Sequence, residues 1–484
     1  MSGMFLTRRL ALWEHLERFH LPKEGLRYWS QNERVHGHAD ASETGSVRRS
    51  AVPSFQLRRD VLDEHLLATA VAEGAELARP ARVVDVELGA GPGSGSAGLE
   101  PTGYQQRVRI AHGARGDRNE TGEETIACRW VLDATGRATL LGRRLGLIER
   151  NHEHPTAALW GRWQGVRHLD DVAARSPSDL ARKNLASRRL ATNHYIGFGY
   201  WVWAIPLGSG ETSVGIVWDT RLVELDLTGS GADREASYRA FLAGIPALSE
   251  LLDGARLRQD DLRCYTHLAY SASRYMGPGW ALLGDAASFL DPYYSPGLDH
   301  AAFSVEATVA IVKAESRGED VAARIEEHNA AFVRSYRRFF RAVYADKYFY
   351  MGEHDLVAAA ILLDTAHYYI FVVMPAYRIF GRFFWMPVLG PKPAFFSYHL
   401  MRIYNRRFKS LALLRRAAGE GGKGNDGRRI NVYFDLDLGA FRMLARGLKL
   451  WAFAELGGLR LAVKRAFGAR APEASAAPAV EHLK

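Results

Sequence analysis

Cysteine is scarce in this sequence. Its 484 residues include two cysteines, Cys128 and Cys264, which are far apart in the chain. Two such residues cannot form a disulfide framework, and their scarcity is typical of a protein of the reducing cytosol. His267 follows Cys264 at a spacing seen in metal sites, but no second pair of ligands completes a zinc site. We therefore expect a cytoplasmic protein without a bound metal.

Long uncharged runs are also missing. The first twenty residues, MSGMFLTRRLALWEHLERFH, carry charges at positions 8, 9, 14, 17 and 18. They contain no apolar core of a secretory signal and predict an amphipathic helix instead. In the last third of the chain, the longest run without Asp, Glu, Lys or Arg is 365–377. A membrane-spanning helix needs roughly 20 apolar residues. The sequence favours a segment that lies on a membrane over one that spans it.

Acidic residues are absent from residues 365–419. This segment accounts for the whole net charge of +9, because it contains nine basic residues and no Asp or Glu: Arg378, Arg382, Lys392, Arg402, Arg406, Arg407, Lys409, Arg415 and Arg416. It is also rich in aromatic and aliphatic residues. That mixture is typical of a surface that contacts anionic lipid or an apolar partner. A basic helical cap over the main domain is the alternative, and nucleic-acid binding is not expected because no nucleic-acid module is recognised.

The remaining pattern predicts an α/β architecture that is followed by helices. Apolar spacing in 54–77 predicts a short strand and a helix that ends at Gly74. Further along the chain the pattern predicts strands at 81–89 and 105–113 with a glycine-rich loop between them, and then a strand, a turn at Thr135-Gly136 and a helix within 125–147. Strands of a second sheet follow within 190–219, a buried strand, a loop and a helix within 279–315, and helices after about residue 315. Residues 471–484 predict a disordered tail.

Two tryptophans stand out in GYWVWAIPLGSGETSVGIVWD (Gly199–Asp219). Trp201 and Trp203 are two residues apart in an alternating run that Pro206 ends. Because side chains alternate along a strand, both rings are expected on one face of a hairpin. A core strand packed against a helix is the ordinary explanation for such a pair.

Three stretches resemble motifs of FAD-dependent oxidoreductases of the aromatic-hydroxylase type: VLDATGR (131–137), LLGDAASFLDPYYSPGLDHA (282–301) and QLRRDVLDEHLLATAVAEGAEL (56–77). In such proteins a carboxylate after a buried strand can accept hydrogen bonds from ribityl hydroxyls, and a helix N-terminus faces the reduced flavin. The resemblance implies these cofactor-binding residues: Arg59, Gly284, Asp285, Ser295, Gly297, Leu298 and Asp299. A helix N-cap remains the alternative role for Asp285, and a surface arginine the alternative for Arg59.

Two further stretches narrow the resemblance to flavin-dependent halogenases of the tryptophan-halogenase type. WVWAIP (201–206) fits their W-x-W-x-I-P motif, and HLPKEGLRYW (20–29) is similar to the segment that carries their catalytic lysine. The resemblance implies that Lys23, Trp201 and Trp203 are catalytic. The tryptophans would keep the organic substrate away from the flavin, and Lys23 would relay the oxidised halide. A solvated lysine in a turn is the alternative for Lys23.

The implied fold class is α/β, with a Rossmann-like FAD-binding part that is incomplete at the N-terminus, an inserted antiparallel substrate sheet and a C-terminal helical region. The corresponding division places the FAD-binding domain in two parts, 1–155, which includes the lysine segment 20–29, and 263–335. The substrate-side sheet lies between them at 156–262. The helical, basic and apolar region follows at 336–470, and the tail at 471–484.

Three departures from the family pattern bear on function. The opening strand, G-x-G-x-x-G loop and helix that hold the FAD diphosphate are absent ahead of Lys23, where the only glycine is Gly3. We expect either a start codon placed too far downstream or a truncated gene product. Tyr294 stands where tryptophan halogenases have a glutamate. Pro296 stands where a backbone amide of the family helps to bind chloride, and proline has no N–H.

The expected function is FAD-dependent oxidation that uses reduced flavin and O2 to halogenate or hydroxylate an electron-rich aromatic or polyene substrate, either lipophilic or bound to a carrier. The expected partners are a separate flavin reductase, since no second dinucleotide loop is visible, a halide ion and an anionic membrane surface, which would place the protein peripherally on the inner membrane. Two alternatives remain: a monooxygenase that needs no halide, and a truncated, non-catalytic binding module.

Overall fold

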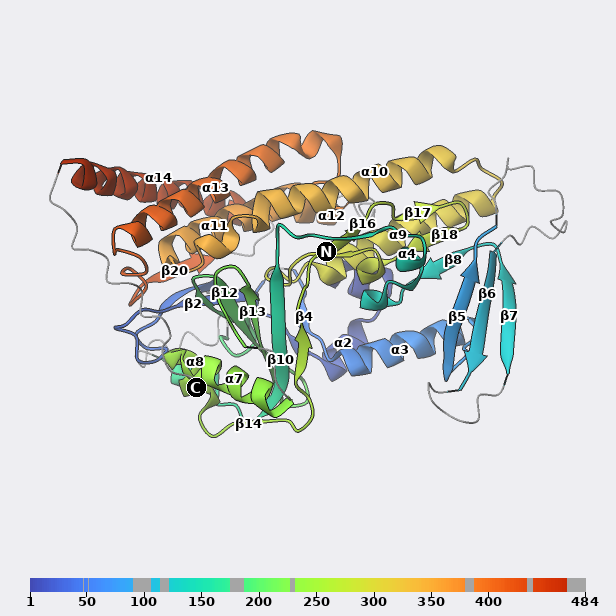
Figure 1. The fold of residues 1–484 in the computed structure, drawn as a ribbon, viewed down its shortest axis with the longest axis horizontal. Coiled ribbons are helices and arrows are strands. Elements are labelled where there is room, and N and C mark those ends of the chain that lie inside the picture. Colours follow the sequence, from blue (N-terminus) through green and yellow to red (C-terminus); the bar gives the residue numbers. More distant parts are fainter. Residues whose placement is uncertain are drawn as a thin grey trace.

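A computed structural model describes residues 1–46, 48–50, 52–89, 106–113, 122–174, 187–226, 231–378, 387–432 and 438–467. A central sheet lies between helices on its two faces, and a small separate sheet lies at one end of the molecule (Figure 1). The glycine-rich loop that follows residue 89 and the predicted tail fall outside the described residues, as does Arg382.

The central sheet has nine described strands in the order β14-β10-β13-β12-β11-β2-β3-β20, with β15 pairing on β10. Their bounds are β2 Leu26–Ser30, β3 Ser42–Ser46, β10 Thr156–Gln164, β11 Thr192–Gly197, β12 Tyr200–Pro206, β13 Thr212–Asp219, β14 Arg256–Leu257, β15 Arg263–Tyr265 and β20 Arg429–Val432. Strands β10 to β13 are antiparallel neighbours, as predicted.

Two features of this sheet correct the sequence predictions. The sheet is mixed rather than antiparallel, because β11 pairs with β2 and β3 pairs with β20 in parallel. It also draws β2 and β3 from the segment assigned to the FAD-binding part, and β20 from the segment expected to be helical. The prediction was wrong for 429–432 because this strand is four residues long, too short to show an alternating pattern.

The two faces of the central sheet carry different cores. Trp201 and Trp203 point to the face that packs against the C-terminal helices, together with Tyr28 and Val217. Val202 and Ala204 point to the other face; they pack in the cluster that contains Leu248 of α8 (Pro246–Leu252) and Tyr238 and Leu242 of α7 (Gly231–Ala243). Strand alternation therefore places both tryptophans on the same side, as predicted.

A second, smaller α/β unit contains the Rossmann-like part. Strands β8 (Val131–Asp133) and β18 (Trp280–Leu282) are parallel, and β17 (Met276–Gly277) extends the sheet. The surrounding elements are β1 Leu21–Pro22, β4 Phe55–Gln56, α3 Arg59–Ala72, α4 Leu140–Arg144, α9 Gly297–Ser316 and α10 Ala322–Phe339. Two three-stranded sheets accompany them: β5 Ala81–Glu87, β6 Gln106–His112 and β7 Glu123–Cys128, and β9 Ile148–Arg150, β16 Tyr270–Ala272 and β19 Ser288–Phe289. In the described residues, β8 and β18 are the only parallel pair of this unit. The short helix α5 (Leu169–Val172) packs instead beside α8 on the central sheet.

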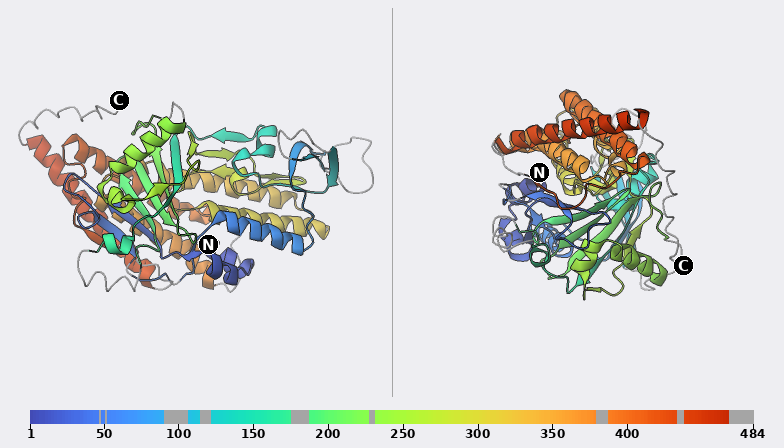
Figure 2. Two further views of the ribbon diagram at one scale, coloured as in Figure 1. Left: turned by 90° about the horizontal axis from the view of Figure 1, so that it is seen from below. Right: turned by 90° about the vertical axis from the view of Figure 1, so that its left-hand side faces the viewer.

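The last third of the chain forms a helical layer over the central sheet (Figures 1 and 2). Its helices are α11 His354–Tyr368, α12 Met374–Arg378, α13 Phe395–Ala417 and α14 Leu438–Phe467. Gly447 and Gly458 let α14 approach its neighbours, because a Cβ there would lie 2.7 Å from Leu363 of α11 and 2.4 Å from Leu411 of α13. The stretch His354–Tyr377 is long and apolar enough to cross a membrane, but 72% of its most apolar window is buried inside the molecule. We therefore interpret it as a core helix.

The N-terminal segment is helical in pieces. α1 (Ser2–Met4) continues into a π-helical turn at Phe5–Arg9, and α2 begins only at Trp13 and ends at Phe19. Ala11 has a φ of 53°, which breaks the helix between them. The single amphipathic helix that the sequence predicts is thus divided in two.

Candidate active site

Lys23 lies between the two-residue strand β1 and β2, and its backbone is fixed on both sides. Its N–H donates to the carbonyl of Ser54 at 2.7 Å, and the N–H of Glu24 donates to Leu190 at 2.9 Å. The Glu24 carboxylate accepts the N–H of Ser187. These bonds join the lysine segment to the strands on either side of it, so Lys23 projects from a fixed turn.

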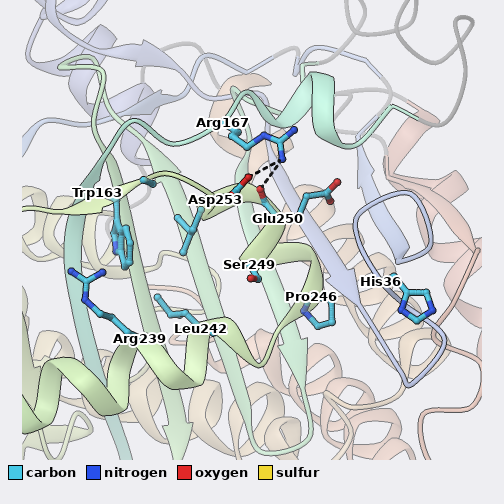
Figure 3. A pocket seen from close by; sticks show the side chains of 12 residues that line it. His36, Trp163, Arg167, Arg239, Leu242, Pro246, Ser249, Glu250 and Asp253 are labelled. Atoms are coloured by element: carbon cyan, nitrogen blue, oxygen red, sulfur yellow. Dashed lines mark hydrogen bonds and ion pairs between the residues drawn. The ribbon is translucent and has the colours of Figure 1, made fainter.

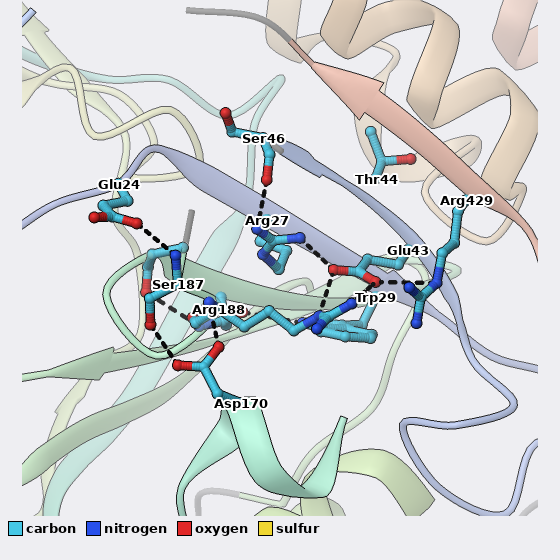
Figure 4. A network of polar contacts seen from close by, with 12 residues as sticks. Glu24, Arg27, Trp29, Glu43, Thr44, Ser46, Asp170, Ser187, Arg188 and Arg429 are labelled. Atoms are coloured by element: carbon cyan, nitrogen blue, oxygen red, sulfur yellow. Dashed lines mark hydrogen bonds and ion pairs between the residues drawn. The ribbon is translucent and has the colours of Figure 1, made fainter. Parts of the chain in front are cut away.

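A buried ionic network supports this turn (Figure 4). The Glu43 carboxylate of β3 accepts bonds from Arg27 of β2 and, at 2.9 and 3.1 Å, from Arg188; Arg429 of β20 lies 3.5 Å away. The N–H of Arg188 donates to Asp170 at 2.6 Å. Burial raises the pKa of Glu43, but the surrounding guanidinium groups outweigh burial and hold it at about 2. The network is therefore ionised at any physiological pH and joins three strands next to the lysine turn.

The Lys23 ammonium makes no ion pair or hydrogen bond with the described residues. Burial lowers its pKa to about 8, and the Asp299 carboxylate opposes this shift only in part. Its charge also reaches His194, whose pKa is lowered to about 3 by burial and then by Lys23. His194 is therefore neutral, and Lys23 is the nearby group that exchanges a proton close to neutral pH.

The tryptophan hairpin lies beside this lysine. The Trp201 ring centroid is 5.3 Å from that of His194, 5.3 Å from Tyr293 and 5.8 Å from Trp203. Trp201 Nε1 donates to the Tyr348 hydroxyl at 2.9 Å, and Tyr348 donates to Asp291 at 2.7 Å. Trp203 Nε1 donates to Ser213 at 3.1 Å. Both indoles are held in single orientations, and His194 connects them to Lys23.

Among the described residues, two buried hydroxyl groups in the core around Trp201 find no hydrogen-bond partner. They belong to Tyr28 and Tyr293, whose side chains are fully buried and whose rings are 5.5 Å apart. Tyr28 also stacks on His194 at 4.7 Å. An unpaired buried hydroxyl costs about 1–3 kcal/mol, so native proteins keep few of them. The two groups mark a place where a polar ligand atom would complete the structure.

A buried ion pair lies on the far side of these hydroxyls. Lys347 Nζ donates to Asp364 at 2.7 Å and to the Tyr294 hydroxyl at 3.2 Å, and Tyr294 donates to Asp364 at 2.8 Å. The Tyr404 hydroxyl also donates to Asp364. Burial lowers the pKa of Lys347, opposed by the Asp364 charge. Tyr294 stands where tryptophan halogenases have a glutamate. Its hydroxyl belongs to the charged cluster of Lys347 and Asp364, so this position stays polar.

The residues predicted to hold flavin lie at the ends of β18 and α9. Gly284 has a φ of 52°, and Asp285 follows it in a single 3-10 turn, Gly284–Ala286. The Asp285 carboxylate is partly buried and accepts no hydrogen bond in the described structure, and burial raises its pKa against the charges of Arg137 and Arg59. A carboxylate in this state suits ribityl hydroxyls as donors.

The start of α9 is shaped by the sequence YYSPG. Ser295 has a φ of 54°, Pro296 is the N-cap, and α9 begins at Gly297 with Leu298 in its first turn. The Asp299 carboxylate accepts the Ser2 N–H at 2.6 Å and the Tyr368 hydroxyl. Burial raises the pKa of Asp299, but the Met1 ammonium and these donors lower it below its ordinary value. The roles of Ser295, Gly297, Leu298 and Asp299 in cofactor binding stay predictions.

Arg59 stands apart from this group. Its side chain is 61% exposed and pairs with Asp63 one turn along α3, with hydrogen bonds of 3.0 and 3.1 Å. Its charge reaches Asp285 without contact. Binding of a cofactor by Arg59 therefore stays a prediction and would require its side chain to leave Asp63.

The described residues fit one half of FAD and not the other. Asp285 and the start of α9 suit the ribityl chain and the flavin ring. For the diphosphate, the described part of the chain offers no strand, glycine-rich turn and helix in sequence. The residue pattern G-x-G-x-x-G does occur at 93–98. It lies in the connection between the antiparallel strands β5 and β6, not between a strand and a helix, and it falls outside the described residues.

An open depression of about 750 Å³ lies elsewhere, on the α7/α8 side of the central sheet (Figure 3). Arg167, Arg239 and Trp163 line it, and Arg239 is held over the Trp163 ring at 5.1 Å. It faces away from Lys23 and the tryptophan hairpin because it belongs to the opposite face of the sheet. The polar groups of the lysine and tryptophan cluster, rather than this depression, carry the candidate chemistry.

Comparison with known proteins agrees with this choice. Residues 172–351, which include the tryptophan hairpin, the Asp285 turn and the start of α9, match the family model described as "Tryptophan halogenase". Over these residues the chain is similar to the flavin-dependent halogenases. This confirms the resemblance that the WVWAIP motif predicts; the lysine segment, 20–29, lies outside the matched residues.

Individual relatives show how far the similarity extends. The chain is 24% identical over 407 residues to the flavin-dependent halogenase chlA of Dictyostelium discoideum, covering 81% of this chain and 63% of that protein. It is 27% identical over 297 residues to the sulochrin halogenase gedL of Aspergillus terreus, covering 60% and 52%. The chain thus spans between about half and two thirds of the length of these halogenases.

Two solved halogenase structures share the fold. PltM superposes with a TM-score of 0.63 at 15% identity, covering 95% of this chain and 89% of PltM. CmlS superposes with a TM-score of 0.55 at 17% identity, covering 96% and 70%. The predicted mixed α/β fold class is confirmed. The predicted domain division remains untested.

Several residues of the halogenase-like site were not predicted from sequence. Asp364 gave a usable signal, because it is the only acid between Asp355 and Glu420 and interrupts an apolar run. A lone carboxylate in such a run favours a buried pair. Lys347 gave none, since it lies outside the quoted motifs. Tyr28 and Tyr293 lie within the quoted stretches 20–29 and 282–301, but nothing in the sequence distinguishes them from the neighbouring aromatic residues.

Proposed function

We propose that this protein is a flavin-dependent halogenase that acts on an electron-rich, hydroxylated aromatic compound. The observation that carries the proposal is the arrangement on one face of the central sheet. The charge of Lys23, which has no ion-pair partner among the described residues, lowers the pKa of His194, and the His194 ring packs against those of Trp201 and Tyr28.

FAD is the proposed cofactor. Asp285 would accept hydrogen bonds from the ribityl chain, and Gly297 and Leu298 would direct the positive end of α9 toward the ring. Reduced FAD with O2 would supply the oxidising equivalents for halide. A separate flavin reductase is the proposed source of reduced flavin. Among solved relatives of the same fold, PltM has been crystallised with phloroglucinol and FAD.

The chain's own residues would then perform three tasks. Trp201 and Trp203, held by Tyr348 and Ser213, would separate the aromatic substrate from the flavin side. Lys23 would hold hypohalous acid by a hydrogen bond from its ammonium and polarise the halogen toward the substrate ring. At a pKa of about 8 it stays mostly protonated at neutral pH, which that role requires.

The unpaired hydroxyls support a phenolic substrate. Tyr28 and Tyr293 can each donate to or accept from a substrate hydroxyl. A phenolic oxygen directs electrophilic attack to neighbouring carbons. A plain hydrocarbon would leave both tyrosine hydroxyls unpaired and is therefore disfavoured.

The test combines the purified chain with FAD, a flavin reductase, O2, chloride or bromide, and a panel of phenols. We expect products with a halogen isotope pattern in mass spectra, lost in Lys23→Ala and kept in Lys423→Ala, whose lysine is on the surface. Quenching of flavin fluorescence on mixing measures binding separately. If FAD does not bind this chain, the alternative of a binding module is favoured for it.

Oxygenation without halide is the second candidate, and Pro296 favours it. A desolvated halide needs donors aimed at it, and Pro296 at the start of α9 has no N–H to give. We therefore expect weak halogenation, or halogenation selective for the more weakly hydrated bromide, and we expect Pro296→Thr to raise it. Products that carry one oxygen from labelled O2, unaffected by halide and by Lys23→Ala, would reject halogenation in favour of a monooxygenase.

A further inference from the structure

The outermost helix, α14, presents a continuous apolar stripe to solvent. Six apolar residues that are between 43% and 65% exposed follow one another at separations of three, four, seven or eight positions: Leu438, Phe441, Leu448, Leu456, Leu459 and Val463. This spacing places them on one face of the helix. We call this set the α14 outer face. Isolated exposed apolar residues are common, but a stripe six residues long on a single helix marks an interaction surface.

The α14 outer face is not the side by which the helix packs on the protein. The packing side carries Ala440, Met443, Gly447, Ala454 and Gly458, which are buried against α11 and α13. Their positions lie on the opposite side of the helical wheel from the stripe. α14 lies on the outside of the helical layer, crossing over the helices beneath it (Figure 2).

A row of cations runs along one edge of the stripe. Arg442, Lys449, Arg460 and Lys464 each directly follow a residue of the α14 outer face, so they lie in a second row beside it. None of the four makes an ion pair with the described residues. The helix contains a single acid, Glu455, and both oxygens of that carboxylate are used, by Arg407 at 3.0 and 2.6 Å and by Trp451 at 2.9 Å.

Part of the basic segment that the sequence singled out is paired with acids. Within 365–419, Arg407 pairs with Glu455 at 2.6 Å, Lys409 with Asp346 at 3.0 Å, and Arg415 with Glu353 and Asp355 at 2.9 and 2.7 Å. Acids of neighbouring elements therefore balance three of the segment's nine basic residues. The four cations beside the α14 outer face have no such acid among the described residues.

We propose that the α14 outer face docks on the surface of an anionic lipid bilayer. The helix would lie in the plane of the interface, with its apolar stripe in the boundary between headgroups and acyl chains and its cation row against lipid phosphates. Its six basic residues prevent it from spanning the bilayer. The proposal stands on α14 alone and does not depend on the halogenase activity; it would give the site access to lipophilic phenols.

A second copy of the chain fits this face less well. A two-fold contact between two stripes would bring two rows of arginine and lysine together, and α14 has no free carboxylate to balance them. Anionic lipid supplies both an apolar layer and negative charge. The chemistry of the face therefore selects lipid over self-association.

The experiment is co-sedimentation of the 484-residue protein with vesicles of phosphatidylcholine alone or with 30% phosphatidylserine, at low and high salt. We expect binding to the anionic vesicles only, reversed by salt. Each basic residue removed should weaken binding about fivefold, which corresponds to about 1 kcal/mol per cation. The variant Arg442→Gln/Lys449→Gln/Arg460→Gln/Lys464→Gln should then no longer sediment.

Matched controls separate this face from net charge and general apolarity. Arg18, Arg107, Arg150 and Arg256 are exposed basic residues on other elements, and changing all four to Gln should leave at least ten times more binding than the α14 variant does. Leu448→Ser/Leu459→Ser should abolish binding, whereas Val71→Ser, an exposed apolar residue of α3, should not. All positions are exposed, and circular dichroism confirms that each variant is folded.

Three outcomes would overturn the proposal. Equal sedimentation with neutral vesicles would remove the role of the cations. No sedimentation with either vesicle would remove lipid as the partner. A dimer mass in light scattering that falls to a monomer in Leu448→Ser/Leu459→Ser would show that a second copy covers the α14 outer face.

Discussion

The two faces of the central sheet are built by the same strands but satisfy their polar groups differently. On the α7/α8 face, the Tyr238 hydroxyl donates to Val214 at 2.8 Å and accepts from Trp163 at 3.1 Å. Both ring nitrogens of His38 are bonded, to Glu250 and Tyr195. On the helical face, Tyr28 and Tyr293 have no partner.

This difference in hydrogen bonding indicates which face of the sheet is suited to bind a ligand. Folding alone would select bonded hydroxyls, as on the α7/α8 face, because an unpaired buried hydroxyl destabilises the native state. The unpaired groups lie between the two lysines and beside Trp201, where a ligand would complete them. In the proposed function, a ligand would bind on the helical face, and the α7/α8 face would serve as structural support.

The largest effect should come from the ion pair of the helical face. Asp364→Ala leaves the Lys347 ammonium buried without a carboxylate, and we expect it to lower the free energy of unfolding by about 3–5 kcal/mol. Lys347→Met/Asp364→Leu removes both charges and should recover most of that loss. Urea denaturation measures both variants. If Asp364→Ala is as stable as the parent protein, the pair does not hold the helical layer to the sheet.

A smaller, pH-dependent effect should come from Lys23. Its pKa is about 8 in the folded protein and near 10.5 in the unfolded chain, so the unfolded chain binds the proton more tightly. Stability that depends on Lys23 should rise with pH between 8 and 10.5, by at most about 1.4 kcal/mol per pH unit, the limit for one proton. Below pH 8 the contribution is constant.

The measurement compares the parent with Lys23→Met in urea at pH 7.5, 8.5 and 9.5. The difference between the two proteins should change with pH in that window. Trace acetylation followed by mass spectrometry gives a second readout, because the Lys23 amine should react with a midpoint near pH 8. Parallel stability curves would contradict the lowered pKa.

The smallest expected change in stability comes from removing a single hydroxyl group on either face of the sheet. Tyr293→Phe should leave stability unchanged or raise it by up to about 1 kcal/mol, since it removes an unpaired buried hydroxyl. Tyr238→Phe should lower stability by about 1 kcal/mol, since it breaks two hydrogen bonds. Thermal denaturation measures both. Equal losses at the two positions would remove the distinction between the faces.

The sequence predicted much of this arrangement through short-range patterns. Alternation placed Trp201 and Trp203 on one face, and the motif around Asp285 placed a carboxylate after a buried strand. The helix at 59–72 and its end near Gly74 were also confirmed. These features depend on neighbours within a few residues, which a linear pattern records.

What the sequence did not predict depends on distant contacts. Lys347 meets Asp364 only because α11 packs beneath the sheet, and the basic residues 409 and 415 are balanced by acids more than 50 residues away. The break at Ala11 and the strand β20 are likewise set by tertiary contacts rather than by local pattern. Charge counting along the chain therefore located an apolar, basic region but could not show which of its cations are paired; a membrane-facing role of 365–419 stays a prediction.

Strand β20 has a consequence for shortening the chain. It covers the outer edge of β3 in parallel register, and its Arg429 adds a charge to the Glu43 network that supports the lysine turn. A chain that stops before residue 429 would lose α14 and leave the backbone groups of β3 open to pairing with another molecule. Such a protein should aggregate, and the turn that carries Lys23 should loosen although that turn lies some 400 residues earlier in the sequence. The N-terminal strands β2 and β3 and the C-terminal elements β20 and α14 therefore depend on one another for stability, and the C-terminal elements cannot be removed without disturbing the Lys23 turn.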